Sequence, residues 1–442
     1  MQNIGRAAIA LLALVARAPG FVPDVPIAFA SATGAAAATS ANKQVAPLAP
    51  VAPVALVAPD RFGMTMRVDY FHSGGMGREG VTFDRVSNDG PWPGSRRELI
   101  DASGSGKYFY EVTDRATKRV LYSRGFASIY GEWETTPEAR ARRRTFHESL
   151  RFPWPTAPVR IVLKKRDAQN RFRDLWVTEI DPRRVGRQSP QKAGGRVVPL
   201  FENGPPSEKV DVLLMSDGYS RDQLAEFRDA SARLVDALFD LEPFRSRRSD
   251  FNVRMLELPG RPASVEFNVF GIERYALAYD NRPMRDLAAS APYDLLVLVV
   301  NKSAYGGGGI FNQQSTVAAG HASSEYVFIH ELAHNLAGLA DEYVGTVTYE
   351  TGLRPHVEPW EPNLTALLDP GALKWRDMVE PGTPIPTPLT HSGKVGAFEG
   401  GGYEARGLYR PEAECIMGSR ARIPFCRVCQ RAISQAIDRH VR

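Results

Sequence analysis

Two near-continuous apolar runs, at residues 210–215 and 294–300, constrain the fold of this chain more than any other feature. Uninterrupted apolar runs of this length are typical of buried strands. Between them, the periodic apolar residues of 224–241 predict a long amphipathic helix, and 251–256 is expected to form a further strand. Because such strands alternate with helices, the pattern predicts an α/β domain over 197–442, with its sheet covered on at least one face.

The stretch before this domain, residues 61–182, follows a different pattern. Short segments separated by Gly, Asp and Pro have the composition of strands, and they lie at 65–70, 107–112, 119–122 and 159–163. Several short strands with frequent turns predict an all-β sandwich. A basic, glycine-bearing linker at 183–196 separates it from the α/β domain, so the predicted fold class is multidomain.

The N-terminal residues indicate export rather than packed structure. Arg6 precedes an apolar run at 7–16, and small-x-small cleavage sites follow, which is the layout of a secretory signal peptide over 1–32. Residues 33–60 are rich in Ala, Pro and Val and predict a semi-rigid tether. We therefore expect a secreted protein, periplasmic or extracellular, with its signal peptide removed. No apolar run approaches the about 20 residues that cross a bilayer, so no stable membrane insertion is expected.

The net charge of +5 is mildly basic, and arginine occurs in short clusters along the chain. Short clusters of this kind are usually solvated loops or helix faces. No basic stretch is interleaved with aromatic residues that would stack on bases, and no groove-reading motif is present. We therefore expect no nucleic-acid partner.

The residues with the clearest chemistry are His330, Glu331 and His334. Two histidines four residues apart on one helix point from the same face and reach one tetrahedral ion. The apolar residues 327–329 before them are expected to bury this helix against the sheet. A glutamate directly after the first histidine acts as general base on a zinc-activated water without binding the metal. The pattern predicts one Zn²⁺ per chain, with both histidines as ligands and Glu331 as the catalytic base.

A catalytic zinc normally has three protein ligands and one open position, so a third ligand is required. Gly338 is suited to a left-handed conformation that ends the helix and turns the chain back. Without this turn, Asp341 would lie roughly 16 Å along the helix axis from His330. We expect Asp341 to be the third ligand, with its neighbour Glu342 as the alternative.

The run 330–343, His-Glu-Leu-Ala-His-Asn-Leu-Ala-Gly-Leu-Ala-Asp-Glu-Tyr, resembles the signature of the IgA-peptidase family of zinc metallopeptidases. Further segments resemble that family in the same order, at 217–219, 242–244, 251–253, 305–309, 360–363 and 398–400. The segment 130–135 is similar to the β-rich domain that often precedes the family's catalytic domain. The resemblance covers nearly everything from Arg61 onward, and implies a metzincin-like zinc endopeptidase that acts on proteins or peptides.

The sequence departs from the standard metzincin pattern after the helix. In the standard pattern, the glycine comes three residues after the second histidine, and the third ligand comes six residues after that histidine. Here Gly338 is four residues after His334, Asp341 is seven after it, and a carboxylate replaces a histidine. The resemblance also implies an edge strand at 306–312 that pairs with extended substrate, the alternative being a flexible loop. It further implies Met417 as a hydrophobic floor beneath the metal, the alternative being an ordinary core methionine.

Three cysteines, Cys415, Cys426 and Cys429, all follow the histidine helix. A disulfide between Cys426 and Cys429, within Cys-x-x-Cys, has poorer geometry. The remaining options join Cys415 to Cys426 or to Cys429. A second, structural zinc would require a fourth ligand, and the sequence shows no obvious one. An oxyanion donor is also required, and the candidates are Tyr343, Tyr403, Tyr409 and His391.

Two alternatives to this interpretation stay open. In the first, the chain is an adhesin or carbohydrate-binding surface protein with a vestigial metal domain, although a pure binding module has no use for Glu331. In the second, a distant glutamate, Glu350 or Glu358, is the third ligand, as in gluzincin-like peptidases. The β domain could bind a glycan or protein, assist folding, or space the enzyme from a surface, and its residues do not choose among these roles. Specificity depends on pocket shape, so the sequence leaves the substrate open, immunoglobulin A included.

Overall fold

The computed structural model describes residues 63–185, 195–345 and 356–441. The expected signal peptide (1–32) and tether (33–60) lie outside the described residues, as does most of the linker at 183–196. All described residues belong to one compact unit, Val57–Arg442. The domain boundaries drawn from the sequence therefore stay predictions.

Two antiparallel sheets form the N-terminal part of the chain. The first has the order β2-β1-β5, with β1 at Met64–Gly75, β2 at Arg78–Pro91 and β5 at Arg144–Pro153. The second has the order β4-β3-β6-β7, with β3 at Tyr108–Asp114, β4 at Val120–Phe126, β6 at Val159–Arg166 and β7 at Phe172–Ile180. Residues from both sheets, such as Val68 on β1 and Ile161 on β6, meet in one apolar core. The predicted sandwich is confirmed, and its expected strands correspond to β1, β3, β4 and β6.

Two short helices, α1 (Ile129–Trp133) and α2 (Pro137–Ala141), precede β5. α1 begins after Ser128, whose side chain accepts a hydrogen bond from the Gly131 amide. Ile129 of α1 shares an apolar cluster with Ile310 of the C-terminal part. This cluster attaches α1 to the strand that flanks the histidine helix.

A six-stranded mixed sheet forms the centre of the C-terminal part. Its order is β14-β15-β13-β9-β10-β8; the four inner strands are parallel, and each edge strand is antiparallel to its neighbour. The strands are β8 (Arg196–Phe201), β9 (Val210–Asp217), β10 (Phe251–Glu257), β13 (Leu295–Val300), β14 (Gly307–Ile310) and β15 (Gln314–Ala318). Every residue of β9, β10 and β13 is buried, as their apolar runs predict. The sequence pattern does not predict β8 or β15.

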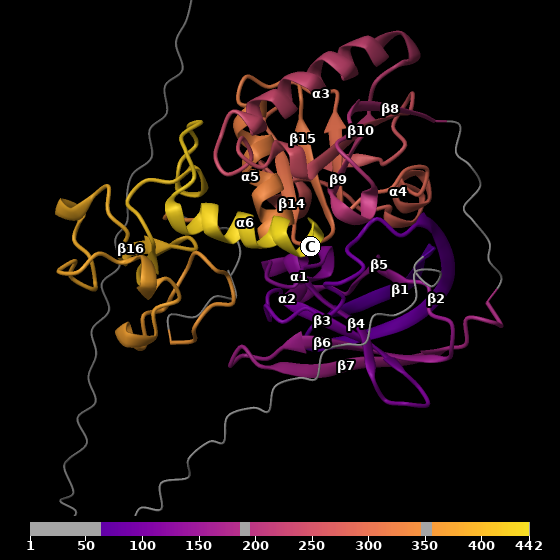
Figure 1. Ribbon diagram of the computed structural model, residues 1–442, viewed down its shortest axis with the longest axis horizontal. Coiled ribbons are helices and arrows are strands. Elements are labelled where there is room, and N and C mark those ends of the chain that lie inside the picture. The colour runs from indigo at the N-terminus through magenta and orange to yellow at the C-terminus, as the bar shows by residue number, and fades with distance from the viewer. Residues whose placement is uncertain (1–62, 186–194, 346–355, 442) are drawn as a thin grey trace, which may run out of the picture. The chain divides into compact units, whose positions relative to one another are not determined.

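Helices cover both faces of this sheet, and they are α3 (Leu224–Phe239), α4 (Asn281–Ala288), α5 (Ser324–Ala337) and α6 (Arg427–Val441). α3, α5 and α6 share an apolar cluster with Val212 and Leu214 of β9. α4 packs with Leu213 and Met215, whose side chains point to the opposite face. The α/β prediction is therefore confirmed, and α5 runs alongside β14 and β15 (Figure 1).

Two short strand pairs complete the fold: β11 (Val265–Phe267) with β12 (Ala276–Ala278), and β16 (Phe398–Gly401) with β17 (Glu404–Arg410). The turn between β16 and β17 contains Tyr403, whose φ of 71° is left-handed. This turn is held by the segment after α5, because the Tyr403 amide donates to the Tyr343 carbonyl.

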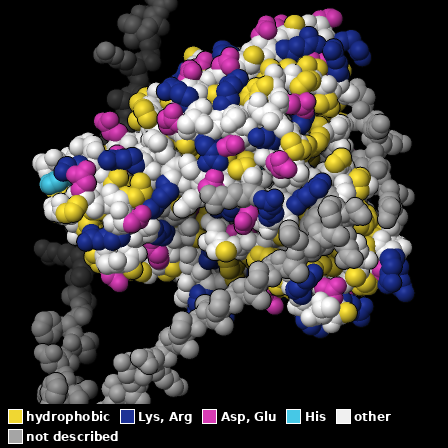
Figure 2. All heavy atoms as spheres, in the orientation of Figure 1, with side chains coloured by type: hydrophobic (Ala, Val, Ile, Leu, Met, Phe, Trp, Pro, Cys, Tyr) yellow, Lys and Arg dark blue, Asp and Glu magenta, His cyan; other side chains and the backbone are white. Residues whose placement is uncertain are grey.

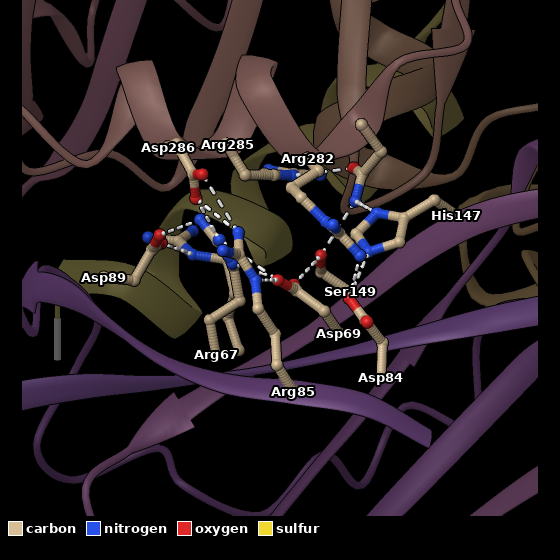
Figure 3. Close-up of polar contacts among 12 residues, drawn as sticks. Arg67, Asp69, Asp84, Arg85, Asp89, His147, Ser149, Arg282, Arg285 and Asp286 are labelled. Carbon is tan, nitrogen blue, oxygen red and sulfur yellow. Dashed lines mark hydrogen bonds and ion pairs between the residues drawn. The ribbon is translucent and has the colours of Figure 1, made fainter. Parts of the chain in front are cut away.

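An ionic network joins the sandwich to α4 (Figure 3). Arg67 on β1 is fully buried, and it donates to Asp69 and Asp89 of the sandwich and to Asp286 on α4. Arg85 on β2 donates to the same Asp286. The network fixes the sandwich against the α/β part, and this contact brings sandwich residues to the candidate site.

Candidate metal centre

Helix α5 carries both histidines and is held in the core by its apolar residues. Val327, Leu332 and Leu336 are at most 3% exposed and belong to the main core cluster. His330 and His334 lie one turn apart on the same face. Their Nε2 atoms approach to 3.0 Å, as the four-residue spacing predicts.

Gly338 ends α5 in a left-handed conformation, with φ 62° and ψ 32°. A larger residue would be strained there, and its Cβ would come within 2.8 Å of the Trp360 ring. The chain turns back at this point, so Asp341 returns to the histidines. Its Oδ1 lies 2.9 Å from the Nε2 of His330 and 3.5 Å from the Nε2 of His334. The structure therefore brings the first-choice third ligand to the histidine pair.

Three donor atoms, one each from His330, His334 and Asp341, converge on one point. Their separations are close to the edges of a tetrahedron whose bonds are about 2.0–2.1 Å long, the zinc–nitrogen distance. On the far side of the rings, the Nδ1 of His330 lies 3.3 Å from the Ile416 carbonyl, and the Nδ1 of His334 lies 2.5 Å from the Leu339 carbonyl. Because carbonyls only accept, both Nδ1 atoms carry protons, and each imidazole in its neutral form presents an Nε2 lone pair to a metal at the shared point. These residues fit a tetrahedral metal ion with one open position.

The ionisable groups of this centre influence one another. Burial opposes ionisation of Asp341, but His334 and His330 hold the pKa of its carboxyl well below the usual range. Burial also disfavours a charged His334, but Asp341 outweighs it and raises the pKa of the imidazole to about 9. Burial raises the pKa of Glu331, although both histidines oppose the rise. A buried glutamate of raised pKa is a better base than an exposed one.

A cavity of about 190 Å³ opens over these residues. Its lining also includes residues that the sequence motif does not single out, namely Ala127, Glu132, Arg274 and Tyr305. Glu132 comes from α1 of the sandwich and accepts a hydrogen bond from the Tyr275 hydroxyl at 3.3 Å. Only the resemblance at 130–135 points to Glu132 in the sequence, and no pattern there indicates Arg274. The sandwich therefore supplies one wall of the cavity.

Tyr343 and Tyr403, two of the four candidate oxyanion donors, line this cavity. Tyr409 and His391 are not among its lining residues. The Tyr403 hydroxyl donates to the Oδ2 of Asp341 and accepts from the Arg274 guanidinium at 3.1 Å. Tyr403 therefore orients the carboxylate whose other oxygen faces the histidines.

Two family models match the chain. The model described as IgA Peptidase M64 matches residues 198–393 and 389–437, which is more than half of the chain. The chain belongs to the IgA peptidase M64 family. The model described as Peptidase M64 N-terminus matches residues 61–177, which include nearly the whole sandwich. A comparison with curated proteins finds no match.

An M64 peptidase acts on proteins or peptides, so the substrate class of this chain follows from its family. Peptidases of this family are generally metallopeptidases, which agrees with the convergent donors of His330, His334 and Asp341. Basic and acidic side chains are intermixed on the face shown in Figure 2. Within the part of the chain that the structure describes, no helix is long and apolar enough to cross a membrane.

The glycine-rich segment of this M64 peptidase is a strand, β14, at the edge of the sheet and antiparallel to β15. Glycine is required because β14 lies close to α5. A Cβ on Gly309 would come within 2.3 Å of the Glu331 carbonyl oxygen and 2.9 Å of the His334 Cβ. The edge strand implied by the resemblance is present, and its glycines also permit close packing on the histidine helix.

The structure does not bring Glu342, the alternative third ligand, to the histidines. Its carboxylate instead lies among Cys415, Cys426 and Cys429. All three cysteines are free, so the suggested disulfide of Cys415 is absent. The sequence shows no obvious fourth metal-binding residue beside the cysteines, but the structure places the Glu342 carboxylate there.

Met417 is fully buried in a short turn, Ile416–Gly418. The turn lies beside the histidine pair, since its Ile416 carbonyl is the acceptor for His330. Glu358 is not near the histidines: it pairs with Lys374 at 3.1 Å and accepts from Thr365 at 3.0 Å. Glu350, the other gluzincin-like candidate, lies outside the described residues.

A third group of metal-binding residue types, Asp69, Asp84 and His147, lies where the sandwich meets α4 (Figure 3). Asp69 accepts from Arg67 at 2.9 Å, and Asp84 accepts from Arg282. Since arginines already balance both carboxylates, this group is part of the ionic network rather than a metal site.

Proposed function

We propose that the protein is an exported, metzincin-like zinc endopeptidase, with His330, His334 and Asp341 as zinc ligands and Glu331 as general base. The observation that carries the proposal is the convergence of three donor atoms beside Glu331 in one cavity. Export rests on the signal-peptide pattern of residues 1–32. When bound, zinc polarises the substrate carbonyl and lowers the pKa of water.

The residues of the chain move the protons and hold the substrate. Glu331 accepts a proton from the attacking water and then delivers it to the nitrogen of the leaving amine. Tyr403 keeps Asp341 directed at the histidines. Arg274 and Tyr343 also line the cavity, and they supply N–H and O–H donors for the oxyanion that forms on the substrate.

Extended substrate docks on the edge of β14 by a short stretch of backbone pairing. Along this edge the Gly307 amide already donates to the Arg274 carbonyl, and the Phe311 carbonyl accepts from the Ala127 amide. The backbone of Gly309 lies between them and faces the same way, because peptide groups alternate along a strand. We therefore expect substrate pairing to be confined to Gly309, with specificity determined by the cavity walls.

The test is cleavage of a broad peptide library by Glu331→Ala and by the wild-type full chain, with zinc measured in both. We expect Glu331→Ala to lose about 10²–10⁴-fold in kcat/KM, because it lacks the general base, and to keep its zinc. Glu325→Ala is the matched control. Glu325 lies on the same helix but pairs with Arg233 and Arg422, so its removal is expected to leave cleavage unchanged.

Cleavage by Glu331→Ala at the wild-type rate would contradict the role of Glu331. Loss of cleavage together with loss of zinc would show that the substitution disturbed the ligands instead. Bound zinc without any cleavage by the wild type would favour a vestigial peptidase that acts as a surface-binding protein.

A further inference from the structure

A second cluster of metal-binding side chains lies beside the histidine centre. Glu342 directly follows Asp341, and Cys415 directly precedes the turn that contains Met417. Cys426 immediately precedes α6, and Cys429 lies in its first turn. The cluster therefore joins three segments of the chain, two of which also contact the histidines.

The four donor groups lie at metal-binding distances from one another. One sulfur from each cysteine and one Glu342 oxygen are all within 4.8 Å of each other. The Oε1 of Glu342 is 3.1 Å from the Sγ of Cys429 and 3.9 Å from the Sγ of Cys426. A tetrahedral zinc with bonds of about 2.3 Å to sulfur and about 2.1 Å to oxygen places such atoms about 3.6 Å apart. One of the two observed oxygen–sulfur distances is shorter than this value and the other is longer.

Burial makes the carboxylate of this cluster costly without a cation. Glu342 is 1% exposed, and Cys429 is fully buried. The Oε1 of Glu342 accepts from the Asn363 amide at 2.9 Å. Its Oε2 is buried and has no hydrogen-bond partner among the described residues. A buried carboxylate is normally paired or bound to a metal, and here the groups around it are thiols.

Two backbone amides of the cluster donate hydrogen bonds to cysteine sulfurs. The amide of Cys426 donates to the Sγ of Cys415 at 3.3 Å, and the amide of Cys429 donates to the Sγ of Cys426 at 3.4 Å. Hydrogen bonds of this kind stabilise the charged form of a thiol, which is the form that binds metal. Because the three sulfurs are free, a disulfide does not account for the cluster.

We propose that Cys415, Cys426, Cys429 and Glu342 bind a second zinc ion with a structural role. Three thiolates and a carboxylate complete a tetrahedron, so no position is left for water or substrate. Tetrahedral sites rich in sulfur are typical of zinc or of iron–sulfur cofactors. We favour a single zinc ion because the four side chains lie close enough together to bind one ion. This site does not depend on the proposed catalysis.

The second ion would hold in place the chain segments that contact His330 and carry Asp341. The Glu342 amide donates to the Met417 carbonyl at 2.8 Å, and the neighbouring Ile416 carbonyl holds His330. An ion bound to Glu342 and Cys415 would therefore fix both of the chain segments that make this contact. It would also fix the position of Asp341, one residue before Glu342.

The test begins with the full-length wild-type protein and needs no variant. Metal analysis is expected to give two zinc ions per chain. After denaturation with a chelator and without reductant, three thiols are expected to react. Stepwise modification of the thiols by a mercurial should release one zinc, detected with a chromogenic chelator, and leave the other bound. A single reactive thiol would show a disulfide and overturn the proposal, and iron with acid-labile sulfide would also overturn it.

Two variants serve as controls for each other, since each removes one site. Cys429→Ser and His334→Ala are each expected to retain one zinc. When Co²⁺ replaces the remaining ion, the ultraviolet charge-transfer band of a cobalt thiolate is expected in His334→Ala and not in Cys429→Ser. Cys429→Ser is also expected to lower the melting temperature by about 10 °C or more.

The outcomes separate this site from the proposed function. One zinc in the wild type and none in His334→Ala would overturn the second site and leave the peptidase mechanism intact. One zinc in the wild type that His334→Ala retains would overturn the zinc ligands of the peptidase proposal and leave the cysteine site intact. If Cys429→Ser does not fold, the thiol count and the zinc release of the wild type still decide the question.

Discussion

At the residue scale, His72 is the most unusual titratable group of the sandwich. It is fully buried on β1, its Nδ1 lies 3.0 Å from Glu148, and its Nε2 lies 2.8 Å from Glu79. Its ring stacks on Tyr130, with the centroids 3.8 Å apart. Burial alone would lower the pKa of this imidazole, but Glu148 and Glu79 raise it to about 9. Both ring nitrogens therefore donate, and the imidazole is charged at neutral pH.

This shift predicts a loss of stability at alkaline pH. Because the pKa is higher in the folded state than the unfolded 6.5, the stabilisation is complete below pH 6.5 and lost as pH rises through about 9. A shift of this size corresponds to on the order of 3 kcal/mol in the free energy of unfolding. Denaturant unfolding between pH 6 and 10 measures it. His72→Gln should remove this part of the pH dependence, whereas His356→Gln, at an exposed histidine, should keep it.

Residue by residue, the sequence predicts the parts of the site that are close together in the chain. His330 and His334 are related by helical spacing, and Gly338 explains how Asp341 returns to them. The sequence leaves Asp341 and Glu342 as alternatives because both carboxylates follow the same turn. The choice depends on Cys415, which lies 73 residues after Glu342 in the chain, and local spacing carries no information about that contact.

At the element scale, the distance between β14 and α5 controls the histidine centre. β14 has glycine at three of its four positions, and helix α5 lies directly against it. An added Cβ at Gly309 would meet backbone and Cβ atoms of α5, which have no flexible end that can move aside. Any side chain at this position therefore separates the strand from the helix.

Gly309→Ala is expected to weaken both the fold and the metal centre. Overpacking of this kind costs about 1–3 kcal/mol in the free energy of unfolding, and here the displaced helix carries the ligands. We expect weaker zinc binding, measured by competition with a chelator, together with a lower melting temperature. Gly80→Ala on β2 is the matched control, because nothing lies within 4 Å of its added Cβ. Equal effects of the two substitutions would contradict the packing argument.

The sequence predicts those strands whose residues are all buried and mostly apolar. β9, β10 and β13 are buried at every position and appear in the sequence as apolar runs. β2 is different, since most of its residues are exposed or half-buried and its sequence is largely polar. β5 buries Glu148 and Ser149, whose partners lie elsewhere in the chain. A polar strand of this kind has no local signal that distinguishes it from a loop.

At the scale of the whole molecule, the sandwich contributes residues to the lining of the candidate site. Ala127 and Glu132 line the cavity, and the Ala127 amide donates to the carbonyl of Phe311, next to β14. The ionic network with α4 also joins the sandwich to the α/β part, and its Arg67 and Asp286 are 219 residues apart. Separate patterns predict the two folds, but no pattern predicts a contact across that separation. A glycan or protein ligand of the sandwich stays a prediction.

The network itself provides a matched pair of substitutions (Figure 3). Arg67 and Arg85 both donate to Asp69 and Asp286, but the Arg67 side chain is fully buried while that of Arg85 is 36% exposed. Arg67→Met removes the buried charge that three carboxylates share, and breaking a buried pair costs about 3–5 kcal/mol in the free energy of unfolding. Arg85→Met is expected to cost at most about 1 kcal/mol, because water screens an exposed pair. Denaturant unfolding of both variants measures the difference. Similar losses in the two would show that burial of Arg67 does not determine how strongly the sandwich is held against α4.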